Sequence, residues 1–242
     1  MVFRLLATTW LYVLLFWLGV ISLSWNTLAF VLLPCLPRRP GQRIGRAGIA
    51  YGYRLFWASA QASGLMRIDA RALDELRDQP GGLIIAANHP SLADALLIVA
   101  RLPRGVCVMK AALMRNIFLG AGARLARYIC NDSTRQMLRR AIASLHEGGQ
   151  LVLFPEGTRT VQGRLNRFLP GLTLIAHKAQ VPIQTVIIET DSPYLGKGWP
   201  IWRLPPLPIE FRLRLGERFA PDADHHAMLA RLEHYFRQEL RP

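Results

Sequence analysis

Hydrophobic and polar positions divide the chain into an apolar N-terminal stretch and a longer region of short alternating elements. Residues 5–34 contain no charged side chain. From residue 80 onward, short apolar runs typical of buried strands alternate with segments in which apolar residues recur at helical spacing. Such alternation predicts an α/β fold with a mostly parallel sheet flanked by helices.

The second region yields a specific series of elements. The pattern predicts strands over 82–87, 105–109, 127–130, 150–154, 181–189 and 209–218. It predicts helices over 93–102, 116–126, 133–149 and 171–179, and a C-terminal helix with an apolar face between Met228 and Phe236. Ser133 and Gln136 have the spacing of a capping box. Residues 191–208, rich in proline, glycine and tryptophan, are predicted to form a loop.

The N-terminal stretch has the length and composition of a membrane segment. About 20 apolar residues cross a bilayer core, and residues 5–34 exceed that length. Three tryptophans suit the membrane interface better than a buried core helix. We therefore assign residues 1–36 to a hydrophobic membrane segment. Whether it spans the membrane or enters and returns stays open, because the polar cluster at 22–27 is compatible with a break between two shorter helices.

The charge balance adds a basic surface next to this segment. Thirty Lys and Arg face sixteen Asp and Glu, a net charge of +14. Seven arginines precede Asp69, the first acidic residue. This placement beside an apolar segment favours anionic lipid over nucleic acid as the polyanionic partner. We predict a basic interfacial helix region over 37–68, with headgroup contacts at 37–46, and a catalytic domain over 69–242. An ordinary surface helix packed on the domain is the alternative for 43–61.

Two polar clusters follow predicted buried strands. Residues 88–94 read Asn-His-Pro-Ser-Leu-Ala-Asp, and residues 155–160 read Pro-Glu-Gly-Thr-Arg-Thr. Ligands of open α/β sheets bind at the carboxyl ends of the strands. The two clusters are therefore expected to meet at one crevice.

The first cluster contains a candidate general base. His89 can take up a proton near neutral pH, and Asp94 can reach its second ring nitrogen across one turn. A helix cap and a turn histidine are the structural alternatives for this spacing. A serine hydrolase would need a nucleophile turn of the Gly-x-Ser-x-Gly type, which is absent, and Ser91 lies too close to His89 in the chain. The histidines show no metal-ligand spacing.

The second cluster offers groups that suit a phosphate. Arg159 can bind two phosphate oxygens with its fork of donors, and Gly157 permits close approach of the backbone. Glu156 and Thr158 add a carboxylate and a hydroxyl. A solvated turn is the alternative for these residues taken alone.

Together the clusters resemble the glycerolipid acyltransferase family, which contains the 1-acylglycerol-3-phosphate O-acyltransferases. The motif Asn-His-x-Ser-x-x-Asp matches Asn88, His89, Ser91 and Asp94, and Phe-Pro-Glu-Gly-Thr-Arg matches residues 154–159 in full. Two further blocks match in part. After Lys110, Ile117 stands where the family has a proline, and Asn131 stands where the family often has an arginine. In the last block, residues 181–186, Thr185 stands where the family usually has a proline.

This resemblance implies an O-acyltransferase. His89 would deprotonate the hydroxyl of a lysophosphatidate-like acceptor, which attacks an acyl thioester of CoA or acyl carrier protein, while Asp94 orients His89. The implied substrate-binding residues are Asn88, Ser91, Lys110, Glu156, Gly157, Thr158 and Arg159. No cofactor and no metal are implied. The enzyme would sit on the cytoplasmic face of the inner membrane, with anionic lipids as partners and no nucleic acid.

Two other interpretations are compatible with these residues. The altered blocks allow the same chemistry on another lyso-lipid, such as an ornithine-type lipid or a glycolipid. A non-catalytic peripheral membrane protein on the same scaffold is the alternative from a different functional class, and the intact pair of His89 and Asp94 argues against it.

Overall fold

A computed structural model describes residues 2–160 and 165–240 of the chain. The elements are α1 (Val2–Cys35), α2 (Arg38–Ala62), β1 (Met66–Asp69), the 3-10 helix η1 (Arg71–Leu76), β2 (Leu83–Ala87), α3 (Asp94–Arg101), β3 (Gly105–Met109), α4 (Ala111–Met114), α5 (Gly120–Leu125), β4 (Ile129–Cys130), α6 (Thr134–His146), β5 (Gln150–Leu153), α7 (Gly171–Ala179), β6 (Ile183–Glu189), β7 (Ile209–Phe219) and α8 (His225–Glu239).

The strands form one sheet with the order β1-β7-β6-β2-β5-β3-β4. All neighbouring strands run parallel except β6 and β7, which are antiparallel. The predicted α/β class with a mostly parallel sheet is therefore confirmed. The predicted strands and helices from residue 80 onward are all present, with small shifts at their ends.

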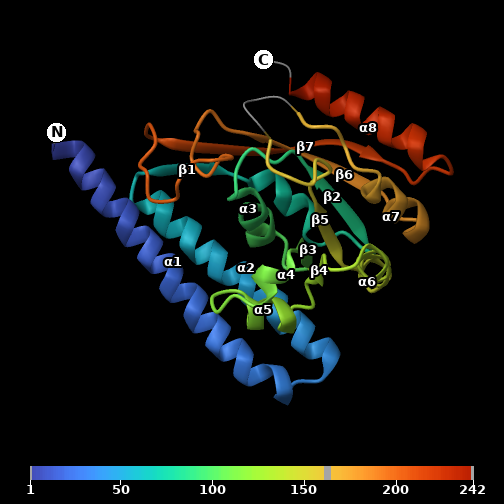
Figure 1. Cartoon of the computed structure of the whole chain (residues 1–242), viewed down its shortest axis with the longest axis horizontal. Helices are drawn as coiled ribbons and strands as arrows, with labels where there is room; N and C mark the ends of the chain where they lie inside the picture. Colours follow the sequence, from blue (N-terminus) through green and yellow to red (C-terminus); the bar gives the residue numbers. More distant parts are fainter. Residues whose placement is uncertain (1, 161–164, 241–242) are drawn as a thin grey trace.

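Helices cover both faces of the sheet (Figure 1). Leu83, Ile85 and Ala87 of β2 point into a core shared with α1, α2, α3 and η1. Ile84 and Ala86, the alternate residues, point into a second core shared with α6, α7 and α8. A strand buried on both faces needs apolar residues at every position, which explains the uninterrupted apolar run.

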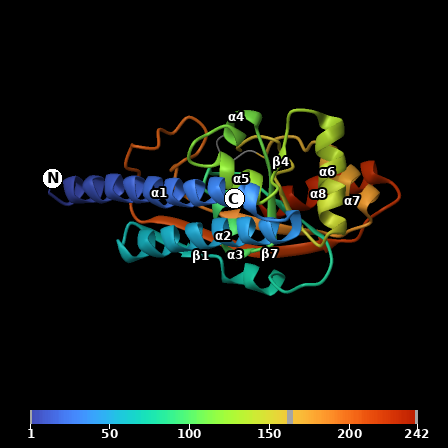
Figure 2. The same cartoon turned by 90° about the horizontal axis from the view of Figure 1, so that it is seen from below.

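The first two helices form an antiparallel hairpin along one side of the domain (Figure 2). α1 is continuous through residues 22–27, so the break that the polar cluster allowed does not occur. Asn26 explains the polar cluster in part. Its side-chain oxygen accepts a hydrogen bond from Gly122 N at 2.9 Å, and its amide nitrogen donates to Ile117 O. A polar residue inside the apolar helix thus fixes α1 to α5 and the loop before it.

Arg46 of α2 faces the protein rather than solvent, and Arg54 is exposed but bonded to the domain. Arg46 is buried and donates to Ala126 O at 3.1 Å and to Ser144 Oγ at 3.3 Å. Burial lowers the pKa of Arg46 to about 10. Arg54 donates to Ala100 O at 3.1 Å. The prediction that residues 37–46 contact headgroups is therefore wrong for Arg46, which joins α2 to the segment after α5 and to α6.

Three local features differ from the sequence predictions. The edge strand β1 and the helix η1 were not predicted, because four residues on a sheet edge are too few for a clear alternation. β1 begins at Met66, inside the region predicted as interfacial helix. The capping box of α6 does not form, since Ser133 makes no side-chain hydrogen bond at its N-terminal cap.

Close packing of α2 on the segment after α5 leads to a stability prediction. A Cβ on Gly45 would lie 2.4 Å from Ala126 N, a backbone atom that cannot rotate away. Gly45→Ala should destabilise the fold by about 1–3 kcal/mol through overpacking. Gly171→Ala, where a Cβ meets nothing within 4 Å, is the matched control. Thermal unfolding in detergent checks this, and equal melting temperatures for the two variants would contradict the close contact.

Candidate active site

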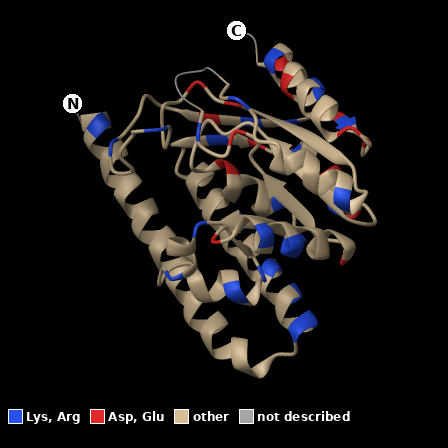
Figure 3. Cartoon of the chain, turned by 45° about the vertical axis from the view of Figure 1, so that its right-hand side comes forward, with Lys and Arg blue, Asp and Glu red and all other residues tan. Residues whose placement is uncertain are grey.

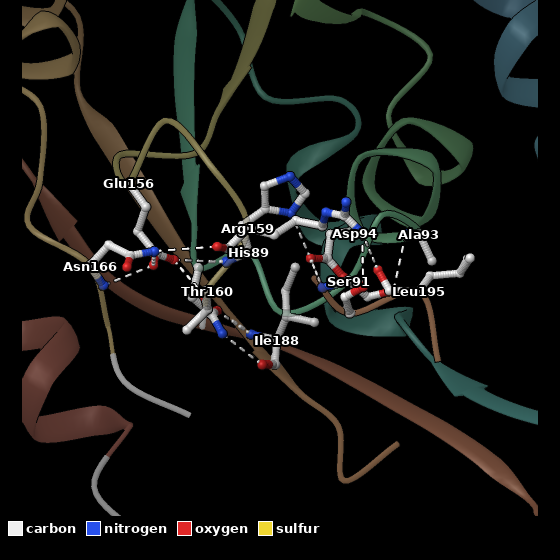
Figure 4. Close-up of polar contacts among 12 residues, drawn as sticks. His89, Ser91, Ala93, Asp94, Glu156, Arg159, Thr160, Asn166, Ile188 and Leu195 are labelled. Atoms are coloured by element: carbon white, nitrogen blue, oxygen red, sulfur yellow. Dashed lines mark hydrogen bonds and ion pairs between the residues drawn. The ribbon is translucent and has the colours of Figure 1, made fainter. Parts of the chain in front are cut away.

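The two polar clusters lie side by side because their strands are neighbours. β2 and β5 pair in parallel, with Ala86 opposite Leu153, so the residues after each strand leave the sheet at the same edge. The backbone of Thr160 donates to His89 O at 2.8 Å, which ties the two loops together. Figure 4 shows the two clusters facing each other. The two clusters therefore meet at one edge of the sheet, as expected, and a crevice between them stays a prediction.

His89 and Asp94 form a close pair. His89 Nδ1 lies 2.9 Å from Asp94 Oδ2, and the same oxygen accepts a hydrogen bond from Ser91 N at 2.8 Å. Asp94 is the first residue of α3, so the turn of residues 88–93 brings its carboxylate back to the imidazole. The other ring nitrogen of His89 points away from Asp94 in Figure 4. That nitrogen is the one placed to exchange a proton with a ligand.

Asp94 sits in a dry environment. Its side chain is 0% exposed, and desolvation raises the pKa of Asp94 to about 6 despite the hydrogen bonds from His89 and Ser91. Its second oxygen, Oδ1, has no hydrogen-bond partner among the described residues. Since a buried carboxylate is costly unless it is paired, the arrangement favours a strong bond to the imidazole.

The ring of His89 is held from a second direction. It stacks on Phe154 with ring centroids 3.9 Å apart and an interplanar angle of 16°. Phe154 directly follows β5, so the first residue of the second motif supports the histidine of the first motif. The His89 side chain remains 15% exposed, which leaves one edge of the ring open to a ligand.

Glu156 organises the loop beneath His89. It is buried, and its Oε1 accepts from His89 N at 3.1 Å and from Thr160 Oγ1 at 2.7 Å. Its Oε2 accepts from Asn166 N at 2.9 Å and Asn166 Nδ2 at 2.8 Å. With both oxygens bonded to protein donors, this carboxylate positions the loop that bears His89.

Asn88 and Ser91, expected as substrate-binding residues, are buried and bonded to the backbone. The Asn88 amide donates to Ile188 O and accepts from Ile188 N, both at 2.8 Å, and so continues the pairing of β2 with β6 by a side chain. Ser91 Oγ donates to Tyr194 O at 3.1 Å and accepts from Ala93 N. These contacts indicate support of the turn, and they disfavour Ser91 as a nucleophile.

The remaining predicted residues of the second motif lie at the surface of the site. Gly157 has φ +67°, and a Cβ there would lie 2.5 Å from the side chain of Leu169, so the position requires glycine. Thr158 is exposed. Arg159 is half-buried and donates through Nη1 to Leu195 O at 2.8 Å and Gly196 O at 2.9 Å. One arm of its guanidinium therefore holds the loop after β6.

Lys110 follows β3, which pairs with β5, and its side chain is exposed. It is thus at the same edge of the sheet as the two clusters.

The residues that sequence reasoning missed are Asn166, Thr160, Phe154 as a ring support, and the carbonyls of residues 194–196. The partners of Phe154 and of these carbonyls lie far away along the chain. Thr160 and Asn166 bond Glu156, which is 4 and 10 residues away, but no local signal marks these bonds.

Comparison with known proteins identifies the family. The family model described as "Acyltransferase" matches residues 67–189, half of the chain, and this range contains both polar clusters. A 1-acyl-sn-glycerol-3-phosphate acyltransferase of Pseudomonas aeruginosa is 25% identical over 190 residues, which is 75% of this chain and 71% of that protein. The protein of the same name from Limnanthes alba is 28% identical over 78% of this chain and 66% of its own length.

A solved structure shares the fold over almost the whole chain. The crystal structure of the 1-acyl-sn-glycerophosphate (LPA) acyltransferase PlsC from Thermotoga maritima superposes with a TM-score of 0.73. The match covers 99% of this chain and 95% of that one at 21% identity, and it includes the N-terminal hairpin. On the family match, the fold and the paired motifs, this chain belongs to the acyltransferase family and is an acyltransferase.

Proposed function

We propose that the protein transfers a fatty acyl group from an acyl thioester to the hydroxyl of a lysophosphatidate-like acceptor. The observation that carries this proposal is the pair of His89 and buried Asp94, with the second ring nitrogen facing the open side of the site. The names of the relatives, which specify 1-acyl-sn-glycerol-3-phosphate, support this acceptor.

In the proposed reaction His89 acts as general base. Asp94 accepts a hydrogen bond from Nδ1–H, which keeps the proton on Nδ1 and leaves Nε2 free to take the proton of the acceptor hydroxyl. The hydroxyl oxygen attacks the thioester carbonyl, a C–O bond forms, and the C–S bond breaks. The imidazolium then returns its proton to the departing thiolate of CoA or acyl carrier protein. No covalent intermediate on the enzyme is required, since Ser91 is buried and bonded to the backbone.

We propose that Arg159, Lys110, Gly157 and Thr158 receive the phosphate of the acceptor. Arg159 Nη1 is bonded to the loop after β6, which fixes the guanidinium plane and leaves its other donors for a ligand. Lys110 adds a positive charge at the end of β3. Asn88, Ser91 and Glu156 contribute by holding the turn around His89.

Substitution of the arginine tests this assignment. Arg159→Lys keeps the positive charge but loses the planar set of donors that can bind two phosphate oxygens. The catalytic efficiency for the acceptor should therefore fall about ten- to a hundredfold, as expected for one charge-assisted hydrogen bond of about 1.5–3 kcal/mol. The KM of the acyl donor should stay nearly constant. Arg167→Lys, at an exposed position nearby, is the matched control. Equal losses for both substrates would assign Arg159 to bracing residues 195–196 and would favour an acceptor without phosphate.

Membrane association follows from the surface of α1. This is the helix, among those described, that is long and apolar enough to cross a membrane, and only 17% of its most apolar window is buried. Its exposed residues include Phe3, Trp10, Phe16 and Phe30, far more apolar surface than water tolerates. In Figure 3 the helix carries almost no charge along its length.

The packing of α1 suggests how it meets the bilayer. Contacts with the domain run along the helix, from buried Leu11 and Leu14 through Trp17, whose Nε1 donates to Ser59 Oγ at 3.2 Å, to Asn26 and Ala29. A helix held along its length to the domain cannot also cross the bilayer. We therefore propose that α1 lies against the membrane with the site facing the lipid surface, on the cytoplasmic side where acyl thioesters occur.

Product analysis tests the function directly. The purified protein is incubated with acyl-CoA or acyl carrier protein donors and a panel of lyso-acceptors, and the lipids are identified by mass spectrometry. We expect acylation of lysophosphatidate, and none by His89→Ala. Acylation of an ornithine-type lyso-lipid or a glycolipid in its place would retain the chemistry and change the acceptor. The absence of acyl transfer to any acceptor would refute the proposal.

A further inference from the structure

One surface segment connects the candidate site with the start of α1. Residues 194–207, which lie between β6 and β7 and are here called the β6–β7 segment, run from the site toward the N-terminus in Figure 1. At one end, Leu195 and Gly196 accept the hydrogen bonds of Arg159. At the other end, the segment lines a groove together with Phe3 and Arg4 of α1.

This groove has a volume of about 560 Å³ and combines apolar walls with two arginines. The walls are Phe3, Trp199 and residues 204–207, and the arginines are Arg4 and Arg203. The guanidinium of Arg203 stacks on the Trp199 ring at 4.6 Å, and Trp199 Nε1 donates to Arg203 O at 2.9 Å. Neither arginine forms an ion pair within the described part of the chain.

Two large apolar side chains of the segment project into solvent beside the groove. Ile201 is 39% exposed and Trp202 is 62% exposed. The neighbouring first turns of α1 expose Val2, Phe3, Leu5 and Leu6, so apolar surface continues from the helix to the segment. Tryptophan beside arginine is the composition of a membrane interface, where the ring sits at headgroup level and the cation meets phosphate.

We propose that the β6–β7 segment is a second membrane-binding element. Ile201 and Trp202 insert at the lipid surface, and Arg4 and Arg203 bind the phosphates of anionic lipid headgroups in the groove. The partner is thus an anionic bilayer, chosen over a protein because the exposed apolar surface is continuous with α1. This inference rests on the proposed membrane seating of α1 and extends it to a loop that also holds Arg159.

A local probe tests the insertion. In the full chain carrying Cys35→Ser, Trp202→Cys is labelled with an environment-sensitive fluorophore and mixed with phosphatidylglycerol-containing vesicles. We expect a blue shift with increased emission. Ala230→Cys is the matched control, because Ala230 is exposed on α8, which packs on the face of the sheet opposite α1. The Cys35→Ser parent without an added cysteine measures labelling of Cys107 and Cys130.

Charge removal tests the groove. A basic residue at an anionic surface contributes about fivefold in affinity, so Arg203→Gln should weaken binding to phosphatidylglycerol vesicles by that factor and leave binding to neutral vesicles unchanged. Arg139→Gln, at an exposed position of α6, removes the same charge elsewhere and should have a smaller effect.

The outcomes separate this inference from the proposed function. A probe at residue 202 that stays in water overturns the proposed insertion, whether or not the protein floats together with the vesicles. Flotation of the protein with the vesicles reports on α1. Equal effects of Arg203→Gln and Arg139→Gln overturn the headgroup site. Neither measurement depends on acyl transfer, so a failure of the proposed reaction would be seen separately in the product analysis.

Discussion

His89→Ala is expected to lower the turnover number by a factor of roughly 10²–10⁴, the contribution of a positioned general base. The imidazole lies between Asp94 and Phe154, and within residues 2–160 and 165–240 no other titratable side chain shares these contacts. Removal of the ring leaves the acceptor hydroxyl without a base. The KM of the acceptor should change little, because we propose that other residues bind its phosphate. Steady-state kinetics with each substrate varied in turn checks this expectation.

His226→Ala is the control for this substitution, because His226 is exposed on α8. It should retain full turnover. Folding of both variants is compared by thermal unfolding, since the His89 ring also packs on Phe154. Wild-type turnover in a folded His89→Ala protein would remove this residue from the mechanism and with it the proposed proton path.

Asp94→Asn should have a comparable effect through a different cause. Asparagine keeps the shape, but one oxygen of Asp94, Oδ2, contacts both His89 Nδ1 and Ser91 N, and an amide nitrogen in its place would donate to His89 Nδ1 and lose the bond from Ser91 N. The imidazole would then carry its proton on Nε2, where it cannot accept one from the acceptor. In serine proteases the equivalent change costs about 10⁴ in turnover. Asp78→Asn, an exposed position, is the control.

The thermal stability of Asp94→Asn shows whether its low activity comes from a changed tautomer of His89 or from unfolding of the protein. Burial raises the pKa of Asp94 to about 6, above its value in an unfolded chain, so ionisation of this group above pH 6 disfavours the folded state. Asparagine carries no charge, and Asp94→Asn should be at least as stable as the wild type at pH 8. Thermal unfolding at this pH measures the difference. A strongly destabilised variant would mean that its low activity reports on the fold.

The raised pKa of Asp94 also predicts how the activity depends on pH under acidic conditions. Below about pH 6 the carboxyl group of Asp94 takes up a proton, and the neutral group no longer stabilises an imidazolium at His89. The catalytic efficiency of the wild type should therefore fall as the pH drops through this value. A pH profile that stays flat down to pH 5 would argue against a role for the ionised pair.

The parts of the site that were predictable from sequence are those encoded locally. His89 and Asp94 lie within one turn, and both motifs directly follow apolar runs that could only be buried strands. The roles of Asn88 and Ser91 could not be predicted, because their partners Ile188 and Tyr194 lie about a hundred residues away. Sequence also identifies an arginine without showing which way it faces.

Arg46 illustrates the last point. It belongs to the stretch 37–46 that was predicted to contact headgroups, yet it is buried against residues 126 and 144. Only the tertiary packing of α2 on the sheet domain decides which cations are structural and which are available to lipid. For the same reason the exposed arginines near the turn of the hairpin remain candidates for headgroup contact.

The position of β1 has a consequence for how the hairpin and the sheet depend on each other. β1 follows α2 directly and pairs with residues 209–212 of β7, so the N-terminal region supplies the outer strand that covers this edge. Without it, the backbone donors and acceptors of β7 would be open to pairing with another chain, a common route to aggregation. The N-terminal region therefore contains both the helix that we propose lies on lipid and the strand that protects β7 from pairing with another chain.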